Sequence, residues 1–568
     1  MSRTSPIILP FTGGMNNVDT PLQLFLKKQG ETQLLVNADT TLNGRLKLLR
    51  PLAALNAVAE ASGIHTVYRA NDKILVGAGA NLKYRDGDAL TAILSGLTSA
   101  HASIIHAGNW AFLGNGTDRK TIYLPTPVGC AWGQDVPSAA PVVVPGAVGS
   151  PNGTYSCYYR YKITLPDGSI LRTGLSPVAS VTVTSDKIEW SGLVHANFIG
   201  ATSNQIELFR TMTGWSATYL VTTLDAGTTT YSDNNTDATV QANTEFAEDG
   251  YYPPPDGINL VVYHPGCDRL FAAVANEIYW SEAGLYHVFV YDETADEYTN
   301  VNSVFLTEED VTGLLMIDEQ LYIASKTTWK RLRGTNPSYW AWEPTVANKG
   351  PVSAAALVLT RNGAVYPGND GYIHLFNGFE SRRITEHFDF TTDPDSTCHA
   401  TFDGRFYRLF YGDATYPELV LDFLNYPSTP VKIIQSTRDY SASCYDSMSD
   451  TFYVGDDDGY LRSGEDTDEE VTLTFKTCEI MADGTDYGDA GSLVLHANTQ
   501  GNDLTIIPYH DEEAQDALTA FSSTSLKREA RVLPLGSYRA LSLQVSITAN
   551  EDIEIREPWL LRKEGDAE

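Results

Sequence analysis

A hairpin pattern returns seven times along this chain, and it limits what the chain can fold into. Its clearest copy is Ser353–Gly378, where the apolar strand Ala354–Leu359 leads into the turn Asn362-Gly363. Further turns follow at Asn369–Gly371 and Asn377-Gly378. Asn-Gly and Asp-Gly supply the positive φ angles that tight hairpins need, so the copy predicts consecutive antiparallel strands.

The spacing of the copies indicates the architecture. The steps between their starts are 37, 158, 52, 42, 45 and 44 residues, counted from Ile64, His101, Asn259, Val311, Ser353, Cys398 and Ala442. Repeats of about 40–50 residues are typical of propeller blades, and removing an insertion of about 110 residues from the long step leaves about 48. Since a blade cannot bury both faces alone, several must stack around an axis. We predict an all-β fold with a β-propeller of about six to eight blades; unrelated hairpins in β-sandwiches are the alternative.

The insertion predicts a small β-sandwich of its own. Several short strands with turn signals occur within residues 151–245, beginning with the alternating strand Gly153–Leu165. Three segments resemble strands of the fibronectin type III domains found in phage tail proteins: Tyr159–Thr164, Leu208–Thr211 and Thr229–Asp233. The resemblance implies a spacer or a subunit contact, with sugar binding as the alternative.

Composition shifts divide the chain into five expected parts. Pro-rich segments bound the insertion, and the acidic run Gly464–Glu470 opens the last part. The parts are an N-terminal arm that feeds a strand into the first blade (1–52), the first blades (53–140), the inserted fibronectin III-like sandwich (141–250), the remaining blades (251–463) and a C-terminal all-β domain (464–568).

Charge argues against general nucleic-acid binding. The chain has 71 acidic and 39 basic residues, a net charge of −32, whereas affinity for phosphates comes from Lys and Arg. Such a surface suits the wall of a DNA conduit, or it serves solubility alone. Residues 1–52 are the exception, with six basic and three acidic residues. Arg45, Lys47 and Arg50 are therefore candidates for docking against an acidic neighbour, with an ordinary solvated face as the alternative.

The motifs of common enzymes are missing from the sequence. It contains no Gly-x-x-x-x-Gly-Lys, no Gly-x-Ser-x-Gly and no His-Glu-x-x-His. We therefore expect no catalytic residue, no cofactor and no metal site. Asp456–Gly459 can attract calcium, but a hairpin turn favours the same residues. The six cysteines stand far apart and read as buried free thiols: Cys130, Cys157, Cys267, Cys398, Cys444 and Cys478.

Membrane insertion and secretion are not expected either. No apolar run approaches the roughly 18 residues of a membrane helix. The apolar cluster Ile7–Phe11 is too short for the core of a signal peptide. We expect a chain that is made and folded in a cytoplasm.

The N-terminal motifs resemble the opening of many phage virion proteins: Gly13–Asn16, Gly30-Glu31, Asn37–Asp39 and Gly44–Pro51. With the propeller, the insertion and the C-terminal segment Arg531–Ile547, the chain is similar to the tail nozzle proteins of short-tailed bacteriophages. That group includes the tail tubular protein B and packaged-DNA stabilisation families.

This resemblance implies a structural protein of the virion and no enzyme. It implies a homo-hexameric ring that contacts the portal–adaptor and other tail proteins. Genomic DNA would pass through its channel without sequence-specific binding, and the ring would retain the genome until host contact.

Two other functions are compatible with the sequence. One is a carbohydrate-binding or polysaccharide-depolymerising propeller that contacts the host surface, because Tyr339, Trp340 and Trp342 can stack on sugar rings. The other is an interaction scaffold of the host, which would stay monomeric.

Overall fold

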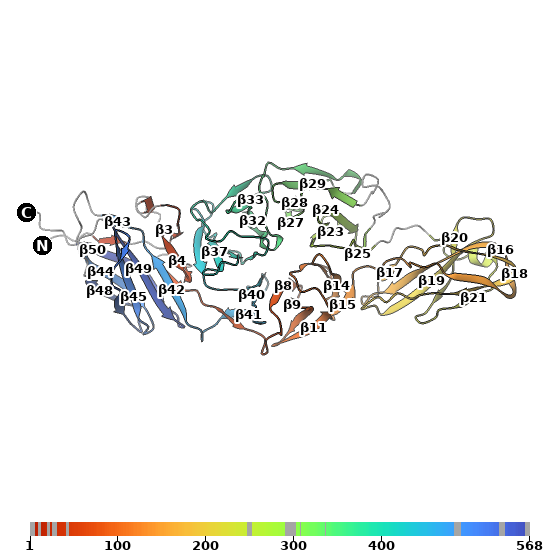
Figure 1. Ribbon diagram of the computed structural model, residues 1–568, viewed down its shortest axis with the longest axis horizontal. Helices are drawn as coiled ribbons and strands as arrows, with labels where there is room; N and C mark the ends of the chain where they lie inside the picture. Colours follow the sequence, from red (N-terminus) through yellow and green to blue (C-terminus); the bar gives the residue numbers. More distant parts are fainter. Residues whose placement is uncertain are drawn as a thin grey trace, which may run out of the picture.

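A computed structural model describes residues 6–8, 13–19, 23–24, 31–40, 45–246, 253–289, 303–306, 308–334, 337–481, 490–532 and 540–562. The molecule is elongated, with a propeller between two β-sandwiches (Figure 1). Its described helical segments are short and include α2 (Asp237–Gln241), η1 (Pro337–Tyr339) and η2 (Ala354–Ala356). Within the described residues, no helix is long and apolar enough to span a membrane. The prediction of an all-β fold is confirmed.

Seven sheets of four or more strands form the blades of the propeller. The first has β8 (Ile64–Ala70), β9 (Lys73–Ala78), β10 (Asn81–Asp86) and β11 (Ala89–Ser95). The second has β12 (Ser103–Ala107), β13 (Trp110–Gly114), β14 (Arg119–Tyr123) and β15 (Val128–Ala131). The third has β22 (Leu260–His264), β23 (Arg269–Val274), β24 (Glu277–Glu282) and β25 (Leu285–Phe289), with β26 (Ser303–Leu306) also on β24. The fourth has β27 (Gly313–Ile317), β28 (Gln320–Ala324), β29 (Trp329–Arg333) and β30 (Ala341–Pro344).

The remaining three blades complete the ring. The fifth has β31 (Val358–Thr360), β32 (Gly363–Pro367), β33 (Ile373–Phe376) and β34 (Ser381–Arg383). The sixth has β35 (His399–Phe402), β36 (Phe406–Phe410), β37 (Glu418–Asp422) and β38 (Lys432–Ser436). The seventh has β39 (Ala442–Asp446), β40 (Thr451–Gly455), β41 (Leu461–Glu465) and, from the N-terminal part of the chain, β7 (Leu52–Ala54). The β-propeller that the spacing predicts is confirmed, and its seven blades lie within the expected six to eight.

The ring closes through β7, which pairs with β41 of the seventh blade. The Leu52 N–H also donates to the Tyr440 hydroxyl at 2.8 Å. The prediction that the N-terminal arm feeds a strand into the first blade is therefore wrong. That blade already takes all four strands from residues 64–95, whereas the seventh has only three consecutive strands before the chain leaves the propeller. The vacant edge is therefore in the last blade.

The insertion forms a sandwich-like module whose strands all belong to one strongly bent sheet. Its order is β20-β19-β16-β18-β21, with β17 also on β16. The strands are β16 (Val142–Thr164), β17 (Ile170–Arg172), β18 (Ala179–Ser191), β19 (Ser203–Thr211), β20 (Thr218–Leu224) and β21 (Tyr231–Asp233). Its apolar core is continuous with that of the second and third blades, through Trp110, Phe112 and Trp132. Such a shared core fixes the module to the propeller.

A fully buried ion pair closes the far side of the inserted sandwich. The Arg210 guanidinium meets Asp233 at 2.8 Å and Asp237 at 2.9 Å, and it also donates to the Asn235 carbonyl. Both the Arg210 and the Asp233 side chains have no exposed surface. Removing one partner would leave an uncompensated buried charge, so the pair holds β19 to the segment after β21.

The C-terminal strands build a second sandwich. They are β42 (Val471–Lys476), β43 (Ile480–Met481), β44 (Ala490–Asn498), β45 (Leu504–His510), β46 (Glu513–Ala514), β47 (Leu518–Phe521), β48 (Lys527–Val532), β49 (Ala540–Ala549) and β50 (Glu554–Arg562). N-terminal strands enter both of its sheets: β4 (Leu34–Val36) pairs with β42, while β1 (Pro6–Ile8) and β6 (Arg45–Leu48) pair with β50, and β5 (Ala38–Asp39) pairs with β6.

The strand β4 joins the propeller to the C-terminal sandwich. It pairs in parallel with β38 of the sixth blade and antiparallel with β42, so one sheet of eleven strands runs through both units. A single apolar core runs across the same junction, from Val365 and Leu409 in the propeller to Leu473 and Val545 in the sandwich. Since both backbone and core are continuous there, we infer a stiff connection.

Candidate functional site

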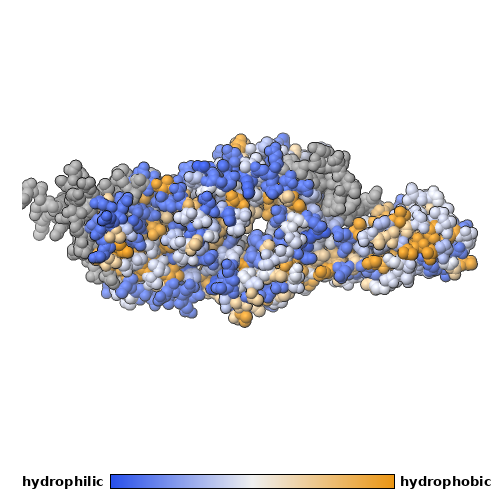
Figure 2. All heavy atoms as spheres, viewed as in Figure 1, coloured by the Kyte–Doolittle hydropathy of each residue, from blue (hydrophilic) through white to orange (hydrophobic). Residues whose placement is uncertain are grey.

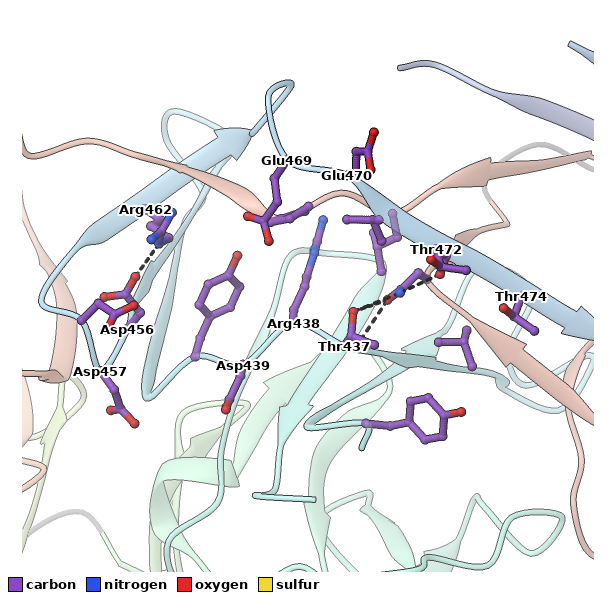
Figure 3. Close-up of a pocket in the computed structure, with 18 of the residues that line it drawn as sticks. Thr437, Arg438, Asp439, Asp456, Asp457, Arg462, Glu469, Glu470, Thr472 and Thr474 are labelled. Carbon is purple, nitrogen blue, oxygen red and sulfur yellow. Dashed lines mark hydrogen bonds and ion pairs between the residues drawn. The ribbon is translucent and has the colours of Figure 1, made fainter. Parts of the chain in front are cut away.

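A hollow lined by polar side chains lies at this junction. It has a volume of about 640 Å³ and lies between the seventh blade, β4 and the start of β42 (Figure 3). Three segments supply most of its polar groups: Thr437–Ser441 after β38, the turn Asp456–Asp458, and Glu469–Thr474 at the beginning of the sandwich. The hollow therefore belongs equally to the propeller and to the sandwich.

Asn37 ties the two units together beside this hollow. Its side-chain amide donates to the Thr437 hydroxyl and to the Thr472 carbonyl, each at 3.0 Å, and its carbonyl oxygen accepts from the Thr437 N–H at 2.9 Å. Dashed lines in Figure 3 end at the labelled partners Thr437 and Thr472. The residue has a φ of 52°, a conformation that Asn adopts more readily than most residues. This explains the physical need for Asn in the motif Asn37–Asp39.

Arg438 is one of two arginines that line the hollow, together with Arg462. Its exposed fraction is 7%, its guanidinium donates to the Arg50 carbonyl, and its Nε has no partner. Burial lowers the pKa of Arg438, and the nearby Glu418 carboxylate opposes that shift. Both effects follow from a charge held in a low-dielectric interior. Arg438 therefore serves the junction, because its guanidinium bonds the backbone of the N-terminal segment.

Five carboxylates line the hollow without forming an ion pair within the described part of the chain: Asp439, Asp457, Asp458, Glu469 and Glu470. Burial raises the pKa of Asp439, and repulsion from Asp457 raises it further. The hollow is therefore acidic and repels anions such as phosphate groups.

Asp456 has a structural role in the turn between β40 and β41. Its carboxylate accepts from the Tyr460 N–H at 2.7 Å and pairs with Arg462, and its carbonyl accepts from the Gly459 N–H. Gly459 has a φ of 86°, and a Cβ there would meet the Glu60 carbonyl oxygen at 2.4 Å. The segment Asp456–Gly459 therefore forms a hairpin turn.

Within the residues that the structure describes, no three His, Cys, Asp or Glu side chains are grouped to hold a metal ion.

The three basic residues that the sequence offers for docking do not share one surface. Arg45 pairs with Glu554 at 3.2 Å, and Arg50 pairs with Asp552 at 2.9 Å and with Glu465 at 3.8 Å. Arg50 has an exposed fraction of only 4%, whereas Lys47 is exposed. The acidic neighbour that two of these residues meet is therefore part of the same chain. Lys47 is exposed and the Arg45 side chain is 39% exposed, so another protein can reach these two side chains but not Arg50.

The aromatic loop is also divided between surface and interior. Tyr339 is 75% exposed. Trp340 packs between Phe271 and Trp280, with ring centroids at 5.3 and 5.1 Å, and Trp342 is half-buried against the same core. The two tryptophans fasten the fourth blade to the third, so Tyr339 is the most exposed ring of the three.

Hydrogen bonds hold His101 and His106 in place, and the cysteines form no disulfide among the described residues. His101 Nδ1 bonds the His65 carbonyl at 2.9 Å, and His106 Nδ1 bonds the Tyr68 hydroxyl at 3.0 Å. All six cysteines are free, four of them buried and two half-buried. Burial raises the pKa of Cys157 and Cys398 to about 12, which keeps both thiols protonated.

Comparison with known proteins leaves the family open. No protein-family model matches the chain, and no curated protein matches it. Among solved structures, it is similar to the computationally designed protein Ika8, with 11% identity and a TM-score of 0.34, over 73% of this chain and 100% of that one. It is also similar to the WD40 repeats of RRP9, with 6% identity and a TM-score of 0.30, over 71% of this chain and 92% of that one.

Sequence reasoning missed the two residues that organise the junction. Asn37 lies inside a quoted motif, so its position carried a signal, although its partners Thr437 and Thr472 are 400 and 435 residues away. Arg438 lies in no motif. Its burial depends on a packing of the propeller against the sandwich that no local pattern specifies.

Proposed function

We propose that this chain is a structural subunit of a phage tail nozzle, a ring that conducts DNA and retains the genome until ejection. The observation that carries the proposal is the role of the motif residues. The segments 37–39 and 45–51, which carry part of the family resemblance, supply strands and contacts that close the C-terminal sandwich onto the propeller. A resemblance confined to an exposed tail would carry less weight.

The stiffness of the molecule supports the same role. Both junctions of the propeller have a continuous apolar core, and one of them also has a continuous sheet. A subunit that retains DNA under load needs parts that do not hinge freely, and large apolar junctions restrain such motion.

Charge supports a conduit rather than a DNA-binding site. A net charge of −32 and an acidic hollow at the junction repel phosphates. DNA would slide along such a wall without adhering, and no sequence-specific contact is needed. The mechanism that we propose is assembly and gating, with no covalent bond broken.

The proposed setting follows from the proposed role. The subunit is made in the host cytoplasm and becomes part of the virion. Its partners are five further copies in a homo-hexamer, the portal–adaptor above and other tail proteins.

Imaging of the intact particle tests this proposal. A gold-labelled antibody fragment against the inserted sandwich is bound to particles, which are then viewed at low resolution. We expect the label around the tail axis below the portal. Label on the capsid, on side fibres or on no particle would overturn the proposal, while a fragment against a known capsid protein controls for access.

A carbohydrate-directed function has less support. It needs a platform of exposed rings, and Trp340 and Trp342 are engaged in packing. Incubation with host surface polysaccharide measures it directly, since released oligosaccharides would establish a depolymerase and displace the nozzle proposal.

A further inference from the structure

The inserted sandwich has an apolar surface with little charge. Figure 2 shows apolar residues gathered over this module, while the visible face of the propeller is largely hydrophilic. No charged residue occurs between residues 136 and 159, in a chain with a net charge of −32. The exposed large apolar side chains of the module and of the segment that leads into it are Val136, Val142, Val144, Val148, Ile170, Val178, Val194, Ile199 and Trp215.

The first part of β16 concentrates these features. Val142 and Val144 lie on one face of the strand with exposed fractions of 53% and 49%, and Val148 is 85% exposed. On one edge, residues 142–148 pair with β18. On the other edge, no strand among the described residues pairs with them.

An uncharged, valine-rich edge of this kind is a template for pairing with another chain. Natural proteins protect such edges with lysines, with prolines or with a covering element. Here Pro145 removes one N–H, but no lysine is present in the segment. The edge and the adjacent valines are therefore the part of the surface best suited to association through backbone pairing and apolar burial.

We propose that the occupant of this surface is a second copy of the same chain. Two copies with charges of −32 repel each other over most of their surfaces, and this repulsion opposes any contact between acidic faces. The inserted module, with five basic and eight acidic residues between positions 136 and 246, is nearly neutral. Copies can therefore meet there at the lowest electrostatic cost. The inference does not depend on a role in a phage tail, because the surface would bring copies together in any setting.

Self-association of the full chain tests the inference. Multi-angle light scattering gives the mass over about 1–100 µM, the range in which weak copy-to-copy contacts are populated. We expect the mass to rise above the 62.2 kDa of one chain. The double variant Val142→Asp, Val144→Asp places two carboxylates on the edge and is expected to weaken association at least tenfold. Val58→Asp, at a 77% exposed valine of the propeller, is the matched control and is expected to associate as the native chain does.

Two results would overturn the inference: a native mass of one chain at every concentration, or unchanged association of the double variant. Circular dichroism and melting temperature show whether the double variant is folded. Should it be unfolded, Val148→Asp alone, at the most exposed position, replaces it with the same expected loss. Particle labelling is independent of these results, so failure of this inference and failure of the nozzle proposal are distinguishable.

Discussion

At the residue scale, Arg50 is a charged residue that the sequence suggests for a docking surface but that the fold buries. Its guanidinium is 5% exposed and reaches Asp552 and Glu465, while its carbonyl accepts from Arg438. It therefore links the N-terminal segment to the C-terminal sandwich and to the seventh blade. The neighbouring Lys47 has no such role, although the two residues look alike in the sequence.

We predict that Arg50→Glu lowers the free energy of unfolding by about 3–5 kcal/mol, because it buries a carboxylate beside two others. Arg50→Met, which buries no charge, should cost less. Lys47→Glu, on the exposed face, should stay within about 0.5 kcal/mol of the native chain. Urea denaturation measures all three. Equal stability of Arg50→Glu and Lys47→Glu would contradict the burial of Arg50 in solution.

The same comparison sharpens the docking hypothesis. Reversing Arg45, Lys47 and Arg50 together would confound docking with folding, because Arg50 is buried. Lys47→Glu reverses one exposed charge and leaves the buried Arg50 unchanged. If docking uses the Lys47 charge, the variant should be folded but poorly incorporated into particles, and normal incorporation would remove the hypothesis.

His287 gives the third residue-scale prediction. It is buried against Trp110 and Phe112, with ring centroids at 4.7 and 5.5 Å, and burial lowers its pKa to about 4 from the usual 6.5 while Asp167 opposes the shift. Between these values the unfolded chain binds the proton and the folded chain does not, so stability falls as the pH falls from about 6.5 towards 4.

The free energy of unfolding of the native chain and of His287→Phe is measured at pH 7 and at pH 5. The quantity compared is how much each of the two proteins loses between these pH values. The variant should lose about 2 kcal/mol less, whatever its stability at pH 7. From pH 7 to pH 8 the two should change nearly in parallel, since the imidazole is mostly neutral in both the folded and the unfolded state. Parallel curves below pH 6 would show that His287 is not buried as a neutral side chain.

At the element scale, β7 is a three-residue strand that closes a ring of seven blades. Spacing predicts the blades because each one repeats its turns locally, and Asn-Gly and Asp-Gly turns are visible in any sequence. It does not predict the closing strand, because β7 pairs with β41 about 410 residues away and is too short for a period to show. The same holds for β4, whose partners β38 and β42 also come from distant parts of the chain.

Side-chain alternation in β7 permits a sharp test of ring closure. Leu52 is buried and Ala54 is exposed, so Leu52→Asp should loosen the strand while Ala54→Asp should not. We expect hydrogen exchange of the β41 amides to speed up at least tenfold in Leu52→Asp, because local opening exposes that edge. Equal protection in both variants would mean that β7 contributes little to closure.

The aromatic loop and the inserted module show where element-scale prediction from sequence ends. The alternating pattern of Gly153–Leu165 predicts a half-buried strand, and β16 covers it. Nothing in Asn336–Trp342 separates the packed Trp340 from the exposed Tyr339, because that distinction depends on Phe271 and Trp280 of the preceding blade.

At the scale of the whole molecule, charge and apolar surface are separated along the long axis. The propeller exposes mainly hydrophilic side chains, and the inserted sandwich at one end exposes apolar ones (Figure 2). Composition predicts the net charge of −32 but not where charged and apolar side chains lie on the surface. Their separation follows from the placement of the insertion outside the ring of blades. A contact between copies would therefore join apolar ends against a repulsion that spans the rest of the surface.

That balance determines how salt acts on self-association. Salt screens both attraction and repulsion between charges. Screening of ion pairs across an interface weakens association, while screening of the repulsion between like-charged copies strengthens it. Since the β16 edge has no charged residue and the copies carry −32 each, repulsion dominates. We predict that association measured by light scattering strengthens as salt rises from about 0.05 to 0.5 M, over which the Debye length falls from roughly 14 to 4 Å. Val142→Asp, Val144→Asp should remain weaker than the native chain at each salt concentration. Association that weakens with salt would point to a charged interface, and thus to contacts elsewhere than the inserted sandwich.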